Sequence, residues 1–224
     1  MLLQLLHSIS PLLYMAYVQY IRTIPPCPDS INMKVARYFH NSFMALISGL
    51  MFMMITIGNA QMDKFSSIES LICKSYGNNW MAYKGSELFL WSKYMEWIDT
   101  LFLQLSGKPI TDLHYTHHMS TAILMYYNMT PYLTHSMYVF MGSNTLVHVF
   151  MYWYYADSYG WLHTYRKWIT RGQILQHVFC LITIYATNIL GEQQCKQNVY
   201  GNVLAFSLYH MYLIYFMVFY LKKY

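Results

Sequence analysis

Long stretches of apolar residues alternate with short polar segments along the whole chain. An α-helix needs about 20 residues to cross the hydrocarbon core of a bilayer, and seven stretches come close to that length. They lie at residues 2–21, 39–58, 80–105, 112–129, 133–155, 168–190 and 202–221. The first has neither a positively charged start nor an evident signal cleavage site, so we expect it to be retained. The pattern predicts an all-α integral membrane protein with seven transmembrane helices in a single membrane domain, residues 1–224.

The composition agrees with a membrane protein. Hydrophobic residues make up 56% of the chain and charged residues only 10%, whereas soluble domains average roughly 25% charged residues. The 24 tyrosines and six tryptophans suit anchoring at membrane interfaces. The net charge of +5 is spread over the loops. We therefore expect the lipid bilayer as a partner, and no nucleic acid.

The basic residues are distributed unevenly between the two sides of the expected membrane domain. Segments after odd-numbered spans hold nine of them: Arg22, Lys34, Arg37, Lys108, Arg166, Lys167, Arg171, Lys222 and Lys223. Segments after even-numbered spans hold four: Lys64, Lys74, Lys84 and Lys196. Because cytosolic loops carry the excess of basic residues, this distribution predicts a cytosolic C-terminus.

Three histidines fall within five residues at the start of the fourth expected span. On a helix, positions i, i+3 and i+4 share one face, so His114, His117 and His118 are expected on the same side. Ionisable groups at membrane depth are costly and indicate a functional site by default. The alternative is a set of core histidines satisfied by hydrogen bonds.

Three more polar motifs with helical spacing lie at the same expected depth. They are Lys93-x-x-Glu96-x-x-Asp99-Thr100, Asn144-x-x-x-His148-x-x-Met151-Tyr152-x-Tyr154-Tyr155 and Thr170-x-x-Gln173-x-x-Gln176. Four separate helix–helix hydrogen-bond clusters would also account for them. Their common depth near the cytosolic end favours one buried site, and it leaves the other half of the bundle nearly free of charge.

The four ordered motifs, including Leu113-His114-x-x-His117-His118, resemble those of the fatty acid elongases of the endoplasmic reticulum. Arg22 and the segment Phe39-His40-Asn41 lie where that family has similar residues. Met95 departs from the usual proline of the first motif, and the chain is shorter than most members. The Lys108-Pro109 pair looks more like the branch acting on saturated and monounsaturated chains.

The resemblance implies the condensing step of elongation, in which acyl-CoA and malonyl-CoA give 3-oxoacyl-CoA, carbon dioxide and CoA. It implies no metal and no further cofactor. Six of the seven spans would enclose an acyl tunnel that is open to the cytosol and closed at the lumenal end. The expected location is the endoplasmic reticulum membrane, with other elongation-cycle enzymes and a second copy of the chain as possible partners.

The resemblance also suggests roles for individual residues. It implies His117 as the acyl acceptor, because a neutral imidazole is a competent nucleophile towards a thioester. Cys180, one turn beyond Gln176 in the sixth expected span, is a rival nucleophile, and a buried core cysteine is the alternative interpretation. The remaining expected catalytic groups would orient His117, move protons or stabilise an oxyanion: His114, His118, Asn144, His148, Glu96 and Asp99. For the two carboxylates, structural pairing with Lys93 is an equally good interpretation.

A second group of residues is expected to bind substrate. The family motifs place Lys93, Tyr152, Tyr155, Gln173 and Gln176 in this group. Basic side chains bind phosphate by charge and hydrogen bonding, so those at the predicted mouth are candidates for CoA binding. They are Lys108, Arg166, Lys167, Lys222 and Lys223. Ordinary positive-inside topology explains any one of these basic residues equally well.

The cysteines give one further expectation. Cys73 and Cys195 fall in the two loops on the side opposite the cytosol, whereas Cys27 is cytosolic and Cys180 lies within the sixth span. The elongase family is similar in having a lumenal disulfide between these loops, and the lumen permits such bonds. We therefore expect a Cys73–Cys195 bridge, with two unrelated free thiols as the alternative.

Two other functional classes remain open. A membrane di-iron desaturase or hydroxylase would use imidazole ligands, although it needs several histidine clusters and this chain has one. A non-enzymatic lipid-binding or transport protein is the third possibility. Internal repeats or broken helices would indicate a transporter, and the sequence shows neither.

Overall fold

The computed structural model describes residues 2–28, 30–74, 79–129, 136–157, 160–190, 195 and 199–224. Every regular element within these ranges is helical, as expected for an all-α protein. The elements are α1 (Leu2–Ser8), α2 (Ser10–Ile21), α3 (Ile31–Gln61), η1 (Lys64–Ser66), α4 (Ile68–Cys73), α5 (Trp80–Met95), α6 (Trp97–Leu105), α7 (Asp112–Met129), α8 (Met137–Ala156), η2 (Trp161–Tyr165), α9 (Arg166–Leu190) and α10 (Val199–Lys223).

Three of the described helices are long and apolar enough to cross a membrane, namely α3, α9 and α10. The other expected spans correspond to helices that are interrupted, shorter or more polar. The start of the fifth expected span, residues 133–135, and the loop residue Lys196 lie outside the described residues. The helices therefore agree with an integral membrane protein, whereas the count of seven spans stays a prediction.

Several helix boundaries differ from those expected. The first span is divided between α1 and α2, and Pro11 lies in the first turn of α2, where a missing backbone N–H is tolerated. The second span starts earlier, at Ile31, because the Ser30 side chain caps α3 by accepting a hydrogen bond from the Met33 amide at 3.3 Å. The third span is interrupted at Glu96, between α5 and α6.

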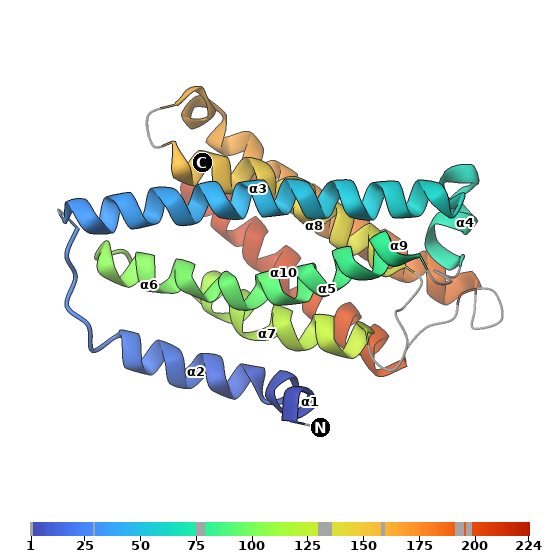
Figure 1. Ribbon diagram of the computed structural model, residues 1–224, viewed down its shortest axis with the longest axis horizontal. Helices are drawn as coiled ribbons and strands as arrows, with labels where there is room; N and C mark the ends of the chain where they lie inside the picture. Colours follow the sequence, from blue (N-terminus) through green and yellow to red (C-terminus); the bar gives the residue numbers. More distant parts are fainter. Residues whose placement is uncertain are drawn as a thin grey trace.

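The helices surround a common interior. The long helix α3 runs along one side of the bundle and packs most extensively on α8, then on α5. On the side away from α3, α2 covers α7 (Figure 1). The last helix, α10, packs on both α7 and α9. Among the helices that carry the four polar motifs, α5 packs on α7 and α8 packs on α9, and α3 and α10 link these two pairs.

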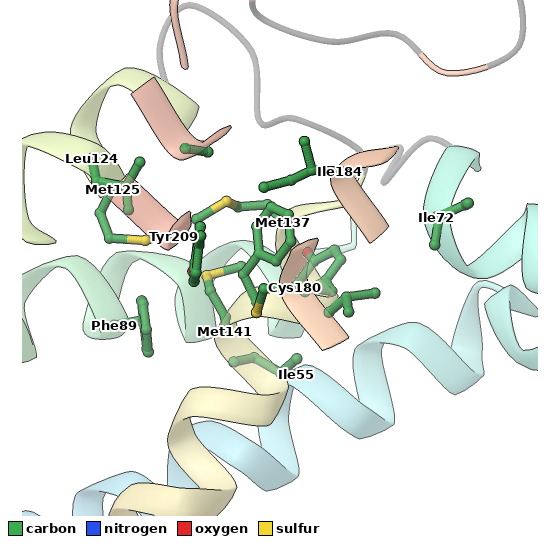
Figure 2. Close-up of a cluster of buried hydrophobic side chains, with 14 of the residues drawn as sticks. Ile55, Ile72, Phe89, Leu124, Met125, Met137, Met141, Cys180, Ile184 and Tyr209 are labelled. Carbon is green, nitrogen blue, oxygen red and sulfur yellow. The ribbon is translucent and has the colours of Figure 1, made fainter. Parts of the chain in front are cut away.

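Apolar side chains fill much of this interior. Seven of the described helices contribute to one buried cluster, whose members include Ile55, Met125, Met141, Cys180 and Tyr209 (Figure 2). Methionine has a flexible, unbranched side chain that fills irregular gaps between helices. The cluster packs directly against the polar site, because Met125 and Tyr209 also line the cavity described below.

A disulfide fastens the end of the bundle that carries α4. It joins Cys73, the last residue of α4, to Cys195, which is 122 positions later in the chain. This is the pairing expected from the sequence. Cys27 is free and exposed, and Cys180 is free and buried.

Candidate active site

Two buried side chains of opposite charge lie where α5 ends. Lys93 is 2% exposed and Glu96 is 1% exposed. Lys93 Nζ donates a hydrogen bond to Glu96 Oε1 at 2.7 Å and another to Asn144 Oδ1 of α8 at 2.9 Å. Because an unpaired buried charge is very costly, this pair requires both members.

His148 closes a ring of contacts with these three residues. Its Nδ1 lies 3.4 Å from Glu96 Oε1, and its Nε2 lies 3.2 Å from Asn144 Nδ2. The amide oxygen of Asn144 already accepts from Lys93, so the amide nitrogen faces His148 and donates to Nε2. The proton of the neutral His148 ring therefore lies on Nδ1, directed at Glu96. The ring of contacts fixes one tautomer of His148 and occupies its lone pair.

Asp99 belongs to a different set of contacts. Its carboxylate accepts hydrogen bonds from His40 Nε2 at 2.9 Å and from the Tyr152 hydroxyl at 2.6 Å. The interpretation of Glu96 and Asp99 as joint partners of Lys93 therefore holds for Glu96 only. The interruption at Glu96 separates the two carboxylates, so that Asp99 faces α3 and α8.

The three histidines at the start of α7 are neighbours but divide between two environments. His114 Nε2 lies 2.9 Å from the Thr100 hydroxyl, which is also 2.8 Å from the Tyr14 hydroxyl. The ring of His118 packs on that of His114, with centroids 4.1 Å apart. The Nδ1 atom of His118 is buried without a hydrogen-bond partner among the described residues. These two histidines therefore face α2 and α6.

His117 faces the opposite way, towards α10. Its ring lies 5.0 Å from that of Tyr212 and 6.5 Å from that of Phe216, measured between centroids. It lines a cavity of ≈ 20 Å³ together with Lys93 and Asn144, and this volume holds about one water molecule. Among the three box histidines, His117 is the one that shares a cavity with the charged centre.

Helix α9 contributes His177, which belongs to none of the four sequence motifs. Gln176 and His177 both line the cavity, whereas Gln173 donates through Nε2 to the sulfur of Met151 at 3.4 Å. Gln173, Gln176 and His177 occupy positions i, i+3 and i+4, the same spacing as the histidine box. This shared spacing is the sequence feature that could have indicated a role for His177. Thr121, Tyr209 and Tyr212 complete the polar lining, and no motif had indicated them.

The remaining expected substrate-binding residues lie outside the cavity. Tyr155 is exposed, with its ring against Tyr154. Lys167 Nζ lies over the rings of Tyr220 and Tyr224, at 5.7 and 5.8 Å from their centroids. Arg166 starts α9, and Lys108 follows α6; both are exposed. The ends of α6 and α10 lie towards the same end of the molecule (Figure 1).

A metal site requires several His, Cys, Asp or Glu side chains close together. Within the ranges that the structure describes, no group of three or more His, Cys, Asp or Glu side chains could hold a metal ion. The box histidines instead engage Thr100 and aromatic rings. The di-iron interpretation has no supporting observation in this part of the chain.

The sequence comparisons assign the chain to a family. Residues 4–224 match the GNS1/SUR4 family of ELO proteins. The chain belongs to the ELO family. The relatives of this ELO protein include "Fatty acid elongase A" of Dictyostelium discoideum, which is 30% identical over 166 residues, or 74% of the chain and 60% of that relative.

Two further relatives carry similar names. "Putative fatty acid elongase 2" of Schizosaccharomyces pombe is 34% identical over 145 residues, or 59% of the chain and 40% of that protein. "Fatty acid elongase 2" of Trypanosoma cruzi is 33% identical over 166 residues, or 69% of the chain and 59% of that protein. The matches thus span less than two thirds of each of these relatives. They do not resolve the branch suggested by Lys108-Pro109, which stays a prediction.

Proposed function

We propose that this ELO-family protein catalyses the condensing step of fatty acid elongation. Acyl-CoA and malonyl-CoA would give 3-oxoacyl-CoA, carbon dioxide and CoA. The observation that supports this most is the position of His117, whose imidazole shares a buried cavity with Lys93 and Asn144. The names of the relatives point to the same class of reaction.

In the first half-reaction, a ring nitrogen of neutral His117 attacks the carbonyl carbon of the acyl thioester. The new C–N bond replaces the C–S bond, CoA leaves as a thiolate, and the proton of the other His117 nitrogen ends on the CoA sulfur. The product is a neutral acyl-imidazole. Lys93 and Asn144 line the same cavity, so they are the donors best placed to meet negative charge on the thioester oxygen.

In the second half-reaction, malonyl-CoA loses carbon dioxide and becomes an enolate. The enolate carbon attacks the acyl carbonyl, a C–C bond forms, and the C–N bond to His117 breaks. His117 then recovers a proton from solvent, which is the one proton that the overall reaction consumes. The enolate thioester carries negative charge, and the buried Lys93–Glu96 pair supports a role for Lys93 in holding it. Charges that are already fixed in place need no reorganisation during the reaction.

Substrate binding would follow the membrane arrangement expected from the sequence. We propose seven spans in the endoplasmic reticulum membrane with a cytosolic C-terminus, six of them enclosing a tunnel open to the cytosol. CoA would bind near Lys108, Arg166 and Lys167. A cavity of ≈ 20 Å³ is too small for an acyl chain, so the proposal requires side chains that line the cavity to move when the chain binds. We also propose that the protein assembles with a second copy of itself or with other enzymes of the elongation cycle.

The direct test supplies purified protein with an acyl-CoA and labelled malonyl-CoA. Formation of labelled 3-oxoacyl-CoA, with one carbon dioxide per product, is the expected result. His117→Asn should abolish it, whereas His210→Asn, at an α10 position outside the cavity, should not. Failure of the wild-type protein to form product across a series of chain lengths would overturn the proposal.

A second test identifies the acylated residue. After incubation with acyl-CoA alone, mass spectrometry should find the acyl mass on the peptide that contains His117, together with free CoA. Cys180 is the rival: its thiol is fully buried in the apolar cluster (Figure 2), 3.8 Å from the Ser143 hydroxyl. An acylated Cys180 peptide would transfer the nucleophilic role to the cysteine.

A further inference from the structure

His177 has the features of a catalytic group but is not part of the motifs that suggested the function. It follows Gln176 in α9, is 3% exposed, and lines the same cavity as His117. Its Nδ1 atom lies 2.6 Å from the backbone carbonyl oxygen of Gln173, one turn earlier. A buried histidine beside the expected nucleophile therefore has one of its two nitrogens fixed by the backbone.

This backbone contact determines what the other nitrogen can do. A carbonyl oxygen only accepts hydrogen bonds, so Nδ1 of His177 must carry the proton and donate it. In the neutral ring, Nε2 then holds a lone pair and acts as an acceptor. No described residue donates a hydrogen bond to this Nε2 atom. His177 thus presents a base, and not a donor, inside the cavity.

The rings of His177 and His117 share their aromatic neighbours. His177 lies 5.7 Å from Tyr212 and 4.9 Å from Phe216 between centroids, and His117 contacts the same two rings. The cavity between these walls has room for about one water molecule. Both histidines line this cavity, so a single water within it can carry a proton from His117 to His177.

None of the other described histidines of the site lines this cavity. His114 contacts Thr100 and packs on His118, on the side of α2 and α6. His148 accepts a hydrogen bond from Asn144 at Nε2 and faces Glu96 with Nδ1. The proton-transfer role expected for His114 and His118 therefore needs another group, and His177 is suitably placed.

We propose that His177 is the base that takes the proton of His117 during acyl transfer, a proposal that rests on the proposed function. As one His117 nitrogen bonds to the acyl carbon, the other loses its proton to Nε2 of His177. The C–S bond breaks, and His177 passes that proton to the departing CoA thiolate. His177 ends neutral, His117 is acylated, and CoA leaves as the thiol.

The chain itself offers a substitution that preserves the backbone contact. Asn59 and Asn128 each donate through Nδ2 to the carbonyl four residues earlier at 2.9 Å. His177→Asn should therefore keep the hydrogen bond to Gln173 while it removes the base. His210 provides the matched control, because its Nδ1 lies 2.7 Å from the Phe206 carbonyl but its Nε2 contacts the Tyr185 hydroxyl, away from the cavity.

The experiment follows the release of CoA thiol from acyl-CoA alone, using the full-length protein. His177→Asn should slow this release by roughly 100-fold or more, the lower range for general-base catalysis. Once its His117 is acylated, its reaction with malonyl-CoA should proceed at the wild-type rate, which a merely structural defect would not allow. His210→Asn should behave as wild type in both steps.

Release of CoA by His177→Asn at the wild-type rate would overturn the role of His177 and leave the proposed function intact. Equal slowing of both half-reactions would also overturn it. No CoA release and no condensation by the wild-type protein would refute the proposed function itself. If His177→Asn does not fold, His177→Gly with added imidazole decides: restored CoA release supports the base, and unrestored release in a folded protein contradicts it.

Discussion

Glu96 and Asp99 are three residues apart, yet their carboxylates contact different sets of residues. Glu96 shares a completely buried contact with Lys93, whereas Asp99 accepts hydrogen bonds from His40 and the Tyr152 hydroxyl. The carboxylate that faces the lysine must stay charged for the lysine to stay buried. The other can lose its charge and keep most of its contacts.

This difference predicts opposite effects of two isosteric substitutions. Glu96→Gln leaves Lys93 without a charged partner and should destabilise the protein by roughly 3–5 kcal/mol, the cost of breaking a buried pair. Asp99→Asn keeps an oxygen for the Tyr152 hydroxyl and should cost only about 1 kcal/mol, the difference between charged and neutral hydrogen bonds. Thermal unfolding in the same detergent measures both. Equal losses of stability would contradict the separation of the two carboxylates.

Lys64 lies in η1, at the end of the chain's long third helix. Its side chain is fully buried, with Nζ 5.2 Å from the centre of the Tyr138 ring. Burial, and then the nearby charge of Lys74, lower the pKa of Lys64 from 10.5 to about 7. Between these two values the unfolded chain binds a proton that the folded chain does not. Stability should therefore rise with pH across this window.

We expect the protein to unfold at a higher temperature at pH 9 than at pH 7. This difference between the two unfolding temperatures should be smaller in Lys64→Met. Lys34→Met removes a lysine from an exposed position and serves as the control. Its pH dependence should match that of the wild-type protein. An unchanged slope in Lys64→Met would show that burial of this lysine does not control the effect.

At the scale of the helices, the close contact between α3 and α5 requires a glycine at position 58. A Cβ atom at Gly58 would lie 2.9 Å from both the Cβ and the backbone nitrogen of Ala82. Such crossings of small residues let helix backbones approach closely. Gly172 of α9 is the opposite case, because a Cβ there would meet nothing within 4 Å.

Gly58→Ala should destabilise the protein by about 1–3 kcal/mol, since the backbone of α5 must move to relieve the overlap. Gly172→Ala should stabilise it by about 0.4–1 kcal/mol, because alanine restricts the unfolded chain at a site that tolerates it. Thermal unfolding of the two variants side by side checks the sign of each effect. A stabilising Gly58→Ala would mean that the two helices are farther apart.

The sequence predicted the helices and the meeting of the four motifs better than it predicted individual contacts. Helical spacing placed the three box histidines near one another, but it could not tell that His117 faces α10 while His114 faces Thr100. That choice depends on which neighbour packs against each side. The break at Glu96 was missed because its local sequence, with Met95, carries no proline or glycine.

Whole-molecule features carry the remaining expectation. The structure joins Cys73 to Cys195 at the end of the bundle that carries α4, and α6 and α10 end towards the opposite end (Figure 1). We expect non-reducing peptide mapping of protein from membranes to give one peptide pair containing both cysteines. Cys27 should be alkylated without reduction, since it is exposed. Separate labelling of Cys73 and Cys195 would contradict the bridge.

The same disulfide sets an order on the biosynthesis of the chain. Its two cysteines are 122 residues apart, and α5 to α9 lie between them. The bond cannot close until the ribosome has passed residue 195 and both cysteines have reached the same compartment. A chain that carries the bridge has therefore already brought α4 and the end of α9 together. The presence of the bridge therefore marks chains in which the segment from α4 to residue 195 has been synthesised and inserted.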